Sequence, residues 1–220
     1  MFIRVRPRVE QWLNLAPIRI FEKMPMIMGE KALDQQSYET YLALEAESDT
    51  KYEYHDGLIV AMAGGTPAHS QLGGNAVRCI GNALEAIQKP CRVYNSDLKV
   101  RIESINRTYY PDASVGCEEP QYSTKDPHAL VNPTLIVEVL SDSNEDFDRG
   151  TKFSRYRRLP SLQEYLLISQ HEVMVDVFYR READLWETYL VGGLDGVVQL
   201  RSLGCELRLA DLYRLVPGLG

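Results

Sequence analysis

The chain has 220 residues, a length typical of a single domain. Apolar residues make up 45% of the sequence and charged residues 25%, a balance that excludes a disordered, collagen-like or coiled-coil protein. The 31 acidic residues exceed the 24 basic residues, which gives a formal net charge of −7. A chain with this charge is not attracted to nucleic acid as a whole, so any such contact requires a local basic patch.

Four cysteines lie far apart and form neither a CxxC pair nor a Cys/His cluster: Cys79, Cys91, Cys117 and Cys205. We therefore expect no structural zinc, no disulfide framework, and reduced thiols in a cytoplasmic protein. No apolar run approaches the roughly 18 residues that a membrane-spanning helix requires. Polar residues interrupt the cationic N-terminus, so we expect neither a secretory signal nor a membrane partner.

Residues 1–30 mix basic, acidic and methionine residues without a sustained helical or strand period. We interpret them as a loosely structured N-terminal extension. Residues 31–220 are expected to form the single domain.

The first part of this domain predicts a helix, a hairpin and a second helix. Ser37 can cap a helix over 34–47. Asp56-Gly57 stands between two short alternating stretches within 51–62, which indicates a hairpin with a type I′ turn. Apolar residues recur at helical spacing over 68–87, and a Lys-Pro pair ends that helix.

The remainder is rich in predicted strands. These strands cover 91–104, 109–116, 134–141, 164–170, 173–180 and 185–191, and helices are predicted over 148–159 and 210–215. Strands and helices mix without an internal repeat, which predicts one α/β core.

An acidic residue stands inside the most apolar of these strands. By the two-residue period of a strand, Glu138 shares a face with Ile136 and Leu140. A lone carboxylate in that position is strongly desolvated, so it requires a cation, hydrogen-bond donors or a metal ion, or it takes up a proton. Pairing with an arginine at the end of a strand is the structural alternative.

A second acid, Asp112, comes directly after Pro111, and a proline marks the edge or the start of a strand. An aspartate in this position is often only a turn former. Two carboxylates from neighbouring strands can converge on one hard cation, and Mg²⁺ accepts one or two carboxylates while it keeps several waters. Asp112 and Glu138 are therefore candidate metal ligands.

The charge changes sign after Glu138. Residues 141–148 carry four acids, whereas residues 149–158 carry five cations and no acid. Complementarity with the helix dipole explains part of this pattern. Asp148, Lys152 and Tyr156 are spaced four residues apart, so they lie on one stripe of the predicted helix. This helix follows the Glu138 strand directly, so the ammonium of Lys152 can point at the metal site.

Together these residues resemble the Uma-type restriction endonuclease family, a divergent branch of the PD-(D/E)XK nuclease superfamily. The resemblance covers roughly residues 34–215 and depends on the order and spacing of its motifs: Pro111-Asp112, Glu138-Val139-Leu140-Ser141, Asp148, Lys152, Tyr156, Glu164-Tyr165, the hairpin at 52–57, and His69. It implies an α/β, restriction-endonuclease-like core, a central mixed β-sheet flanked by helices, with Mg²⁺ or Mn²⁺ at one edge.

The resemblance also implies roles for individual residues. Asp112, Glu138 and the carbonyl of Val139 are expected to bind the metal ion. The lysine of the superfamily normally lies two residues after the glutamate, where this chain has Leu140. Lys152 on the next helix is expected to take its place as the catalytic lysine.

Glu53 is a further expected catalytic acid, and a solvated position beside the hairpin turn is its alternative. Four arginines are expected to hold the phosphate backbone: Arg149, Arg155, Arg157 and Arg158. The implied activity is metal-dependent hydrolysis of phosphodiester bonds in DNA. A homodimer is usual for enzymes that cut both strands, and here it is inferred by analogy of fold.

Two other interpretations remain open from the sequence. The first is a catalytically inactive nuclease-like fold that serves as a DNA-binding or protein-interaction module, which the acidic charge and Leu140 favour. The second is a metal-dependent hydrolase or transferase that acts on another phosphorylated substrate. For His69, at the start of a helix, we expect a structural hydrogen bond rather than a catalytic role.

Overall fold

The computed structural model describes residues 35–62, 64–141 and 147–219, so the predicted extension over 1–30 lies outside the described residues. The helices of the described part are α1 (Tyr38–Glu47), α2 (Pro67–Ala86), α3 (Phe153–Tyr156) and α4 (Leu209–Leu212). None of these helices is long and apolar enough to cross a membrane. The strands form two mixed sheets and one short hairpin, which confirms the predicted α/β class.

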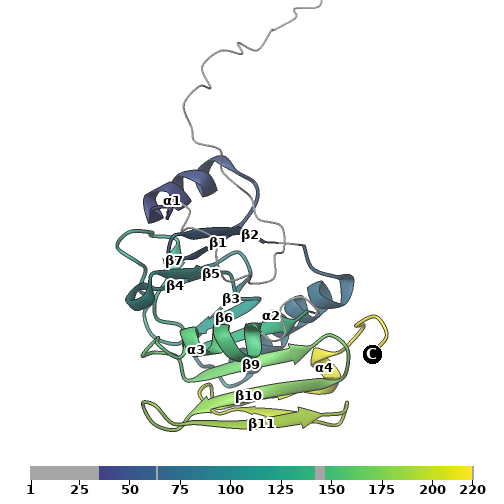
Figure 1. Ribbon diagram of the computed structural model, residues 1–220. Helices are drawn as coiled ribbons and strands as arrows, with labels where there is room; N and C mark the ends of the chain where they lie inside the picture. Colours follow the sequence, from purple (N-terminus) through teal and green to yellow (C-terminus); the bar gives the residue numbers. More distant parts are fainter. Residues whose placement is uncertain (1–34, 63, 142–146, 220) are drawn as a thin grey trace, which may run out of the picture.

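The first sheet has five strands in the order β2-β1-β5-β4-β7. These strands are β1 (Tyr52–His55), β2 (Leu58–Ala61), β4 (Lys99–Ile102), β5 (Arg107–Tyr109) and β7 (Ala129–Leu130). Helix α1 packs on this sheet through four buried tyrosines, Tyr38, Tyr41, Tyr52 and Tyr54, and forms the top of the described domain in Figure 1.

The second sheet has six strands in the order β11-β10-β9-β8-β6-β3. These strands are β3 (Arg92–Asn95), β6 (Ala113–Gly116), β8 (Leu135–Leu140), β9 (Glu164–Ser169), β10 (Met174–Arg180) and β11 (Trp186–Gly192). The hairpin consists of β12 (Val197–Leu200) and β13 (Cys205–Arg208). Only β8 and β9 are parallel within the six-stranded sheet, and α3 lies on the connection between them.

Strand β8 is covered on both of its faces, as its apolar sequence predicts. Val137 and Val139 belong to a core cluster that includes Leu72 of α2, whereas Ile136 and Leu140 belong to a second cluster with α3 and the five-stranded sheet. Figure 1 shows α3 in front of the sheet and α2 behind and to its right. A side chain on the face of Ile136 and Leu140 therefore lies between α3 and the other sheet.

Local signals in the sequence set several element bounds. The hydroxyl of Ser37 accepts a hydrogen bond from the backbone N–H of Thr40 at 3.1 Å, so Ser37 is the N-cap of α1. Thr66 caps α2 in the same way. The hairpin turn between β1 and β2 has φ angles of 51° at Asp56 and 99° at Gly57, and a type I′ turn requires positive values at both positions.

Two predicted strands are each divided in the structure. Residues 91–104 form β3 and β4, which belong to different sheets. Residues 109–116 contain the end of β5 and the whole of β6, and the chain passes from the five-stranded to the six-stranded sheet at Tyr110-Pro111-Asp112. Proline has no N–H to donate to a ladder, so it ends the pairing there. We call this crossing point the seam between the sheets.

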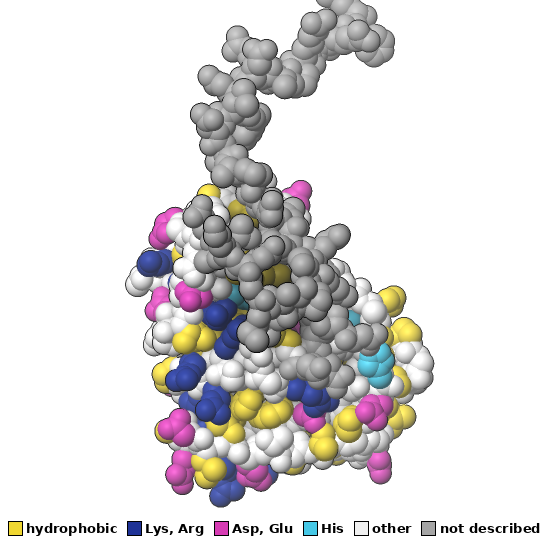
Figure 2. Space-filling view, viewed as in Figure 1, with side chains coloured by type: hydrophobic (Ala, Val, Ile, Leu, Met, Phe, Trp, Pro, Cys, Tyr) yellow, Lys and Arg dark blue, Asp and Glu magenta, His cyan; other side chains and the backbone are white. Residues whose placement is uncertain are grey.

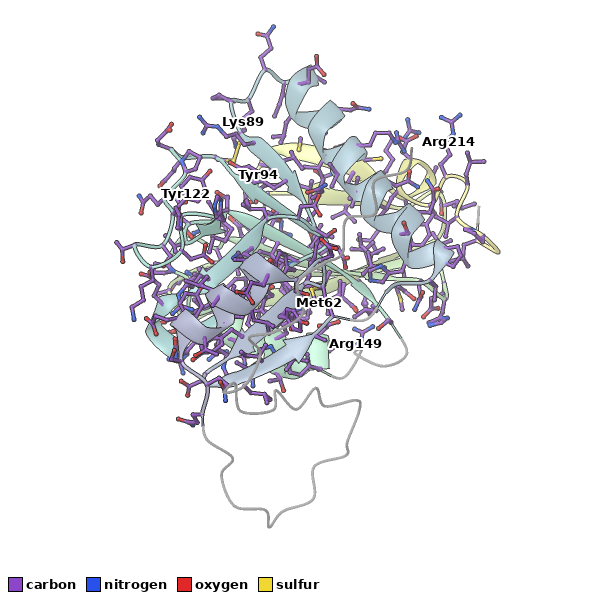
Figure 3. The ribbon with its side chains drawn as sticks, turned by 90° about the horizontal axis from the view of Figure 1, so that it is seen from above. Met62, Lys89, Tyr94, Tyr122, Arg149 and Arg214 are labelled. Carbon is purple, nitrogen blue, oxygen red and sulfur yellow. A yellow bond between two sulfur atoms is a disulfide. The ribbon has the colours of Figure 1, made fainter. Side chains whose placement is uncertain are left out.

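The expectation of reduced thiols is wrong for two of the four cysteines. Cys91 and Cys117 lie opposite each other just beyond the last paired residues of β3 and β6, and they form a disulfide with their Cα atoms 4.0 Å apart. Figure 3 shows the bond beside Lys89. The pairing depends on strand register, which spacing along the sequence does not reveal. Cys79 and Cys205 are free thiols.

Candidate active site at the seam between two sheets

Glu138 lies in β8 with its side chain only 5% exposed. The hydroxyl of Tyr156 in α3 donates a hydrogen bond to its Oε1 at 3.0 Å, and the ammonium of Lys152 lies 2.9 Å from the same oxygen. The buried acid that the sequence singled out is therefore paired with an amine and a hydroxyl. No arginine of the described residues pairs with it, although such a pair was the structural alternative.

Asp112 faces Glu138 across the end of a ladder. β6 pairs with β8 as far as Ala113 opposite Val137, so the next position of β6 would place Asp112 opposite Glu138. The backbone ladder stops here, and instead Oδ2 of Asp112 accepts the N–H of Val139 at 2.7 Å. Pro111 thus ends the strand pairing, and the carboxylate that follows it takes over a main-chain donor beside Glu138.

A π-helical turn brings Lys152 to this point. The predicted helix over 148–159 consists of a π-helical turn, Phe147–Lys152, followed by α3. Such turns are rare and often occur at functional sites. Asp148 and Lys152 are both buried on this turn, with Nζ of Lys152 3.7 Å from Oδ1 of Asp148.

The five-stranded sheet contributes Glu53. This residue of β1 is buried, and its Oε1 lies 3.5 Å from Nζ of Lys152. Its Oε2 lies 3.0 Å from Nε2 of His55, which lies on the same face of β1. The alternative of a solvated position beside the hairpin is therefore wrong, because Glu53 faces the inside of the protein.

The site contains more negative than positive charge, and the pKa values reflect this imbalance. Burial raises the pKa of Asp112 and, to about 6, that of Asp148. Burial also raises the pKa of Glu138 well above its ordinary value, against the attraction of Lys152. Burial alone would lower the pKa of Lys152, but Glu138, Glu53 and Asp148 together raise it well above its ordinary value. The amine is therefore held as an ammonium.

His69 lies at the other side of Asp112. Its Nε2 is 3.4 Å from Oδ2 of Asp112, and its backbone N–H donates to the capping hydroxyl of Thr66 at the start of α2. The expected structural hydrogen bond at the helix start is present through the backbone. The imidazole in addition contacts the candidate metal ligand.

The protein itself holds two of the four arginines that were expected to bind nucleic acid. The guanidinium of Arg149 bonds to Asp176 of β10. Arg155 donates to the hydroxyl of Tyr109 at 2.7 Å and lies over the ring of Phe147. Neither contact involves Glu138 or Asp112, so these arginines flank the acids rather than join them.

The other two, Arg157 and Arg158, are exposed at the C-terminal end of α3. Arg158 lines both of two neighbouring surface hollows of about 510 and 530 Å³. The basic residues that line them are Arg107, Arg155, Arg157, Arg158, Arg180 and Arg181, together with the acids Asp56, Glu103, Glu182 and Asp184. Figure 2 shows Lys and Arg side chains gathered on the side of the molecule where Figure 1 draws α3.

A divalent metal ion fits the chemistry of these donors. Asp112 and Glu138 offer carboxylate oxygens, the hard ligands that Mg²⁺ prefers. Oδ1 of Asp148 is buried without a hydrogen-bond partner within the described residues. No three Asp, Glu, His or Cys side chains of the described part form a ready-made metal cage. The carboxylates of Asp112 and Glu138 are the groups that would hold the ion, and water would complete its coordination.

Sequence reasoning did not assign two groups of this site. His55 beside Glu53 could have been found from the two-residue period of β1. Asp148 was placed on one stripe of the predicted helix with Lys152 and among the motifs of the resemblance, but it received no role in the site. The π-helical geometry that buries both Asp148 and Lys152 has no comparable signal in the sequence.

The two mixed sheets and their flanking helices have a nuclease-like fold of the restriction-endonuclease class. A family model described as "Uma2: Putative restriction endonuclease" matches residues 38–210. The chain therefore belongs to the Uma2 family, which confirms the resemblance seen in its sequence.

Two relatives come from Synechocystis sp. and bear the names "Uncharacterized protein slr1290" and "Uncharacterized protein sll1609". The first is 35% identical over 81% of this chain and 91% of its own length. The second is 38% identical over 59% of this chain and 72% of its own length. A crystal structure from Anabaena variabilis, described as "a putative nuclease belonging to DUF820", matches with a TM-score of 0.61 at 20% identity and covers 76% of this chain and 91% of its own. This likeness establishes the fold.

Proposed function

We propose that this protein is a divalent-metal-dependent endonuclease that hydrolyses phosphodiester bonds in DNA, with Mg²⁺ or Mn²⁺ as its cofactor. The observation that carries the proposal is that Asp112, Glu138 and Lys152 meet at one buried site at the seam. Burying charged groups costs free energy that a purely structural role does not require. Membership of a family described as a restriction endonuclease supports the same activity.

The protein's own residues have distinct parts in this mechanism. When bound, the metal ion would polarise the phosphate and lower the pKa of a water molecule. Asp112 and Glu138 would hold the ion with two negative charges, and the carbonyl of Val139 would add a neutral ligand. The ammonium of Lys152 is a compact cation that can orient the attacking water and stabilise negative charge that develops on the phosphate oxygens.

The arginines around α3 would hold the substrate. Phosphate contacts supply most of the affinity of proteins for DNA without reading its sequence. Arg155, Arg157 and Arg158 line hollows on one side of the protein, which provides the local basic patch that a chain of charge −7 requires. We assign Arg149 a supporting part, because its guanidinium is bonded to Asp176.

The same proposal includes a homodimer and a cytoplasmic location. Strand β11 is the outer strand of the six-stranded sheet, and Leu185 and Leu190 beside or within it are 56% and 61% exposed. β10 lies between β9 and β11, so of these two strands only β11 has an edge that is unpaired within the described sheet. In the cytoplasm the Cys91–Cys117 disulfide would be an exception, because thiols there are usually kept reduced. Sedimentation of the purified protein would decide the oligomeric state.

The alternative function is a catalytically inactive nuclease-like module that binds DNA or a protein. Leu140 in place of the usual lysine favours it, because Leu140 is buried in the core and has no catalytic group. The ion pair between Lys152 and Glu138 counts against it, because the amine reaches the acid from another element.

The test is nicking of supercoiled plasmid with Mg²⁺ or Mn²⁺, with a chelator added in a parallel reaction. We expect the wild-type protein to nick the plasmid and Glu138→Ala and Asp112→Ala to lose this activity while they stay folded. Glu119→Gln, which changes an acid whose side chain is 88% exposed, is the control and should nick normally. Cleavage by Glu138→Ala at the wild-type rate would exclude the assigned site.

The assay also separates the other interpretations. An inactive module would leave the plasmid uncut, whether or not it bound DNA, and would show no carboxylate-dependent metal binding. An enzyme that acts on another phosphorylated substrate would bind the metal ion but leave both DNA and RNA intact.

A further inference from the structure

The ammonium of Lys152 lies among three carboxylates. Its Nζ is 2.9 Å from Oε1 of Glu138, 3.5 Å from Oε1 of Glu53 and 3.7 Å from Oδ1 of Asp148. These four side chains are at most 11% exposed, so water screens their charges weakly. Lys152 is thus in the environment that a bound cation would have.

The local charge count shows how few cations this cluster contains. When all four carboxyls are ionised, Asp112, Glu138, Glu53 and Asp148 carry four negative charges, whereas Lys152 carries one positive charge. A net charge of about −3 in a poorly solvated site favours a further cation strongly. A divalent ion and the ammonium therefore require the same buried negative charge.

We infer that Lys152 acts as a resident cation that competes with the divalent metal ion for Glu138 and thereby sets the metal affinity of the site. The inference rests on the proposed function. It gives Lys152 a second role, control of metal affinity, in addition to its proposed part in hydrolysis. A divalent ion held by Glu138 repels the ammonium at 2.9 Å from that carboxylate. Part of the binding free energy of the metal is therefore spent on moving Lys152 away from Glu138.

Glu53 and Asp148 are the groups that can receive the displaced ammonium. Their oxygens lie at 3.5 and 3.7 Å from Nζ, longer than a good charged hydrogen bond, so each can be approached further. Oδ1 of Asp148 has no hydrogen-bond partner within the described residues. These two acids are positioning residues in this scheme, because they act on the site through Lys152.

The experiment is a calorimetric titration with Mn²⁺ alone, without nucleic acid. Lys152→Met removes the ammonium and keeps an unbranched side chain. We expect it to bind Mn²⁺ at least about tenfold more tightly than the wild type, since a unit charge some 4 Å away has a large effect at low effective dielectric. Lys125→Met removes an equal charge at a surface position where the side chain is 61% exposed and should leave the affinity unchanged.

A double variant separates competition from a simple change in net charge. Asp148→Asn together with Lys152→Met removes one negative and one positive charge, so the charge of the cluster stays at about −3. Competition predicts that this variant still binds Mn²⁺ more tightly than the wild type. It also carries the test if Lys152→Met alone does not fold, because the net charge of the buried cluster stays equal to that of the wild type.

Unchanged or weaker Mn²⁺ binding by the folded Lys152→Met or double variant would overturn the inference. That result leaves the proposed function intact if the wild-type protein binds Mn²⁺ and nicks plasmid. A wild-type protein that neither binds Mn²⁺ nor nicks plasmid would overturn the proposed function itself. The two failures are therefore distinguishable.

Discussion

The ammonium of Lys152 lies 2.9 Å from Oε1 of Glu138, although the two residues come from different secondary-structure elements. In a strand, a lysine two residues after the glutamate would project from the same face. Leu140 occupies that position and packs in the core instead. Lys152 reaches the same face from the π-helical turn that follows the strand. The amine thus lies beside Glu138 although it comes from another element of the chain.

Asp112 offers a prediction that separates metal binding from stability. Its Oδ2 accepts the N–H of Val139, so Asp112→Ala leaves that buried donor without a partner. We expect Asp112→Ala to lower the free energy of unfolding by about 1–3 kcal/mol. Asp112→Asn keeps an oxygen for this bond and should lower it by less. Both variants should lose Mn²⁺ binding, as measured by calorimetry beside denaturant unfolding curves. Equal stability of the two variants would contradict the role of this bond.

Asp148 predicts a pH dependence of stability in chelator-treated protein. The pKa of its carboxyl is raised from 3.8 to about 6, mainly by burial, so the folded state binds the proton more tightly than the unfolded state does. The wild type therefore loses stability as the pH rises from about 4 to about 6.5. At roughly 1.4 kcal/mol per pKa unit, the loss is about 3 kcal/mol.

Asp148→Asn removes this titration, so its free energy of unfolding should gain about 3 kcal/mol relative to the wild type between pH 4 and pH 7. Urea unfolding at a series of pH values measures the difference. Asp49→Asn, an exposed position, controls for the loss of one carboxyl group. If the difference in free energy of unfolding between Asp148→Asn and the wild type stays constant across this range, burial does not raise the pKa of the Asp148 carboxyl.

The disulfide between Cys91 and Cys117 closes a loop with a sequence separation of 26 residues. In the chain-entropy model a loop of this length stabilises the folded state by about 3.5 kcal/mol. Cys91→Ser with Cys117→Ser should therefore lower the melting temperature, and a reducing agent should lower that of the wild type to a similar value. Cys79→Ser, at a free thiol, serves as the control for the effect of the reductant.

The exposed arginines predict a salt-dependent effect on DNA binding. Arg157→Ala and Arg158→Ala should each weaken binding to DNA of any sequence. Each should also reduce the slope of the logarithm of the binding constant against the logarithm of the salt concentration by about one. Arg214→Ala, an exposed arginine that lines neither hollow, should change neither quantity. Filter binding at several salt concentrations, with a chelator present to prevent cleavage, measures both. An effect of Arg214→Ala equal to that of Arg158→Ala would indicate non-specific charge attraction.

Much of the site was predictable from the sequence because a charged residue among apolar neighbours is costly to bury and therefore stands out. An acid in an apolar strand, as Glu138 is, conflicts with its neighbours unless it has a partner. The proline before Asp112 likewise marks a point where strand pairing must end, and the change of charge sign before Lys152 marks the start of a basic segment. These signals are local, and they identified three residues that the structure brings into one site.

The remaining features depend on contacts between distant segments. The alternating stretch at 91–104 reads as one strand, but its two halves join different sheets because each finds its partner elsewhere in the chain. The disulfide between Cys91 and Cys117 follows from the register of β3 and β6. The inward position of Glu53 depends on contacts between β1 and the distant π-helical turn, where Lys152 lies 3.5 Å from Glu53. Short alternating strands do not encode which of their faces is covered.

Because the chain changes sheets at Tyr110-Pro111-Asp112, the acids of the site do not share one rigid scaffold. Glu53 lies in the five-stranded sheet and Glu138 in the six-stranded sheet. A small sliding of one sheet over the other would therefore alter the spacing of the cluster while both sheets kept their own hydrogen bonds. Catalysis should accordingly fail under mild denaturing conditions that leave the circular dichroism of the protein unchanged, so that loss of turnover precedes loss of structure.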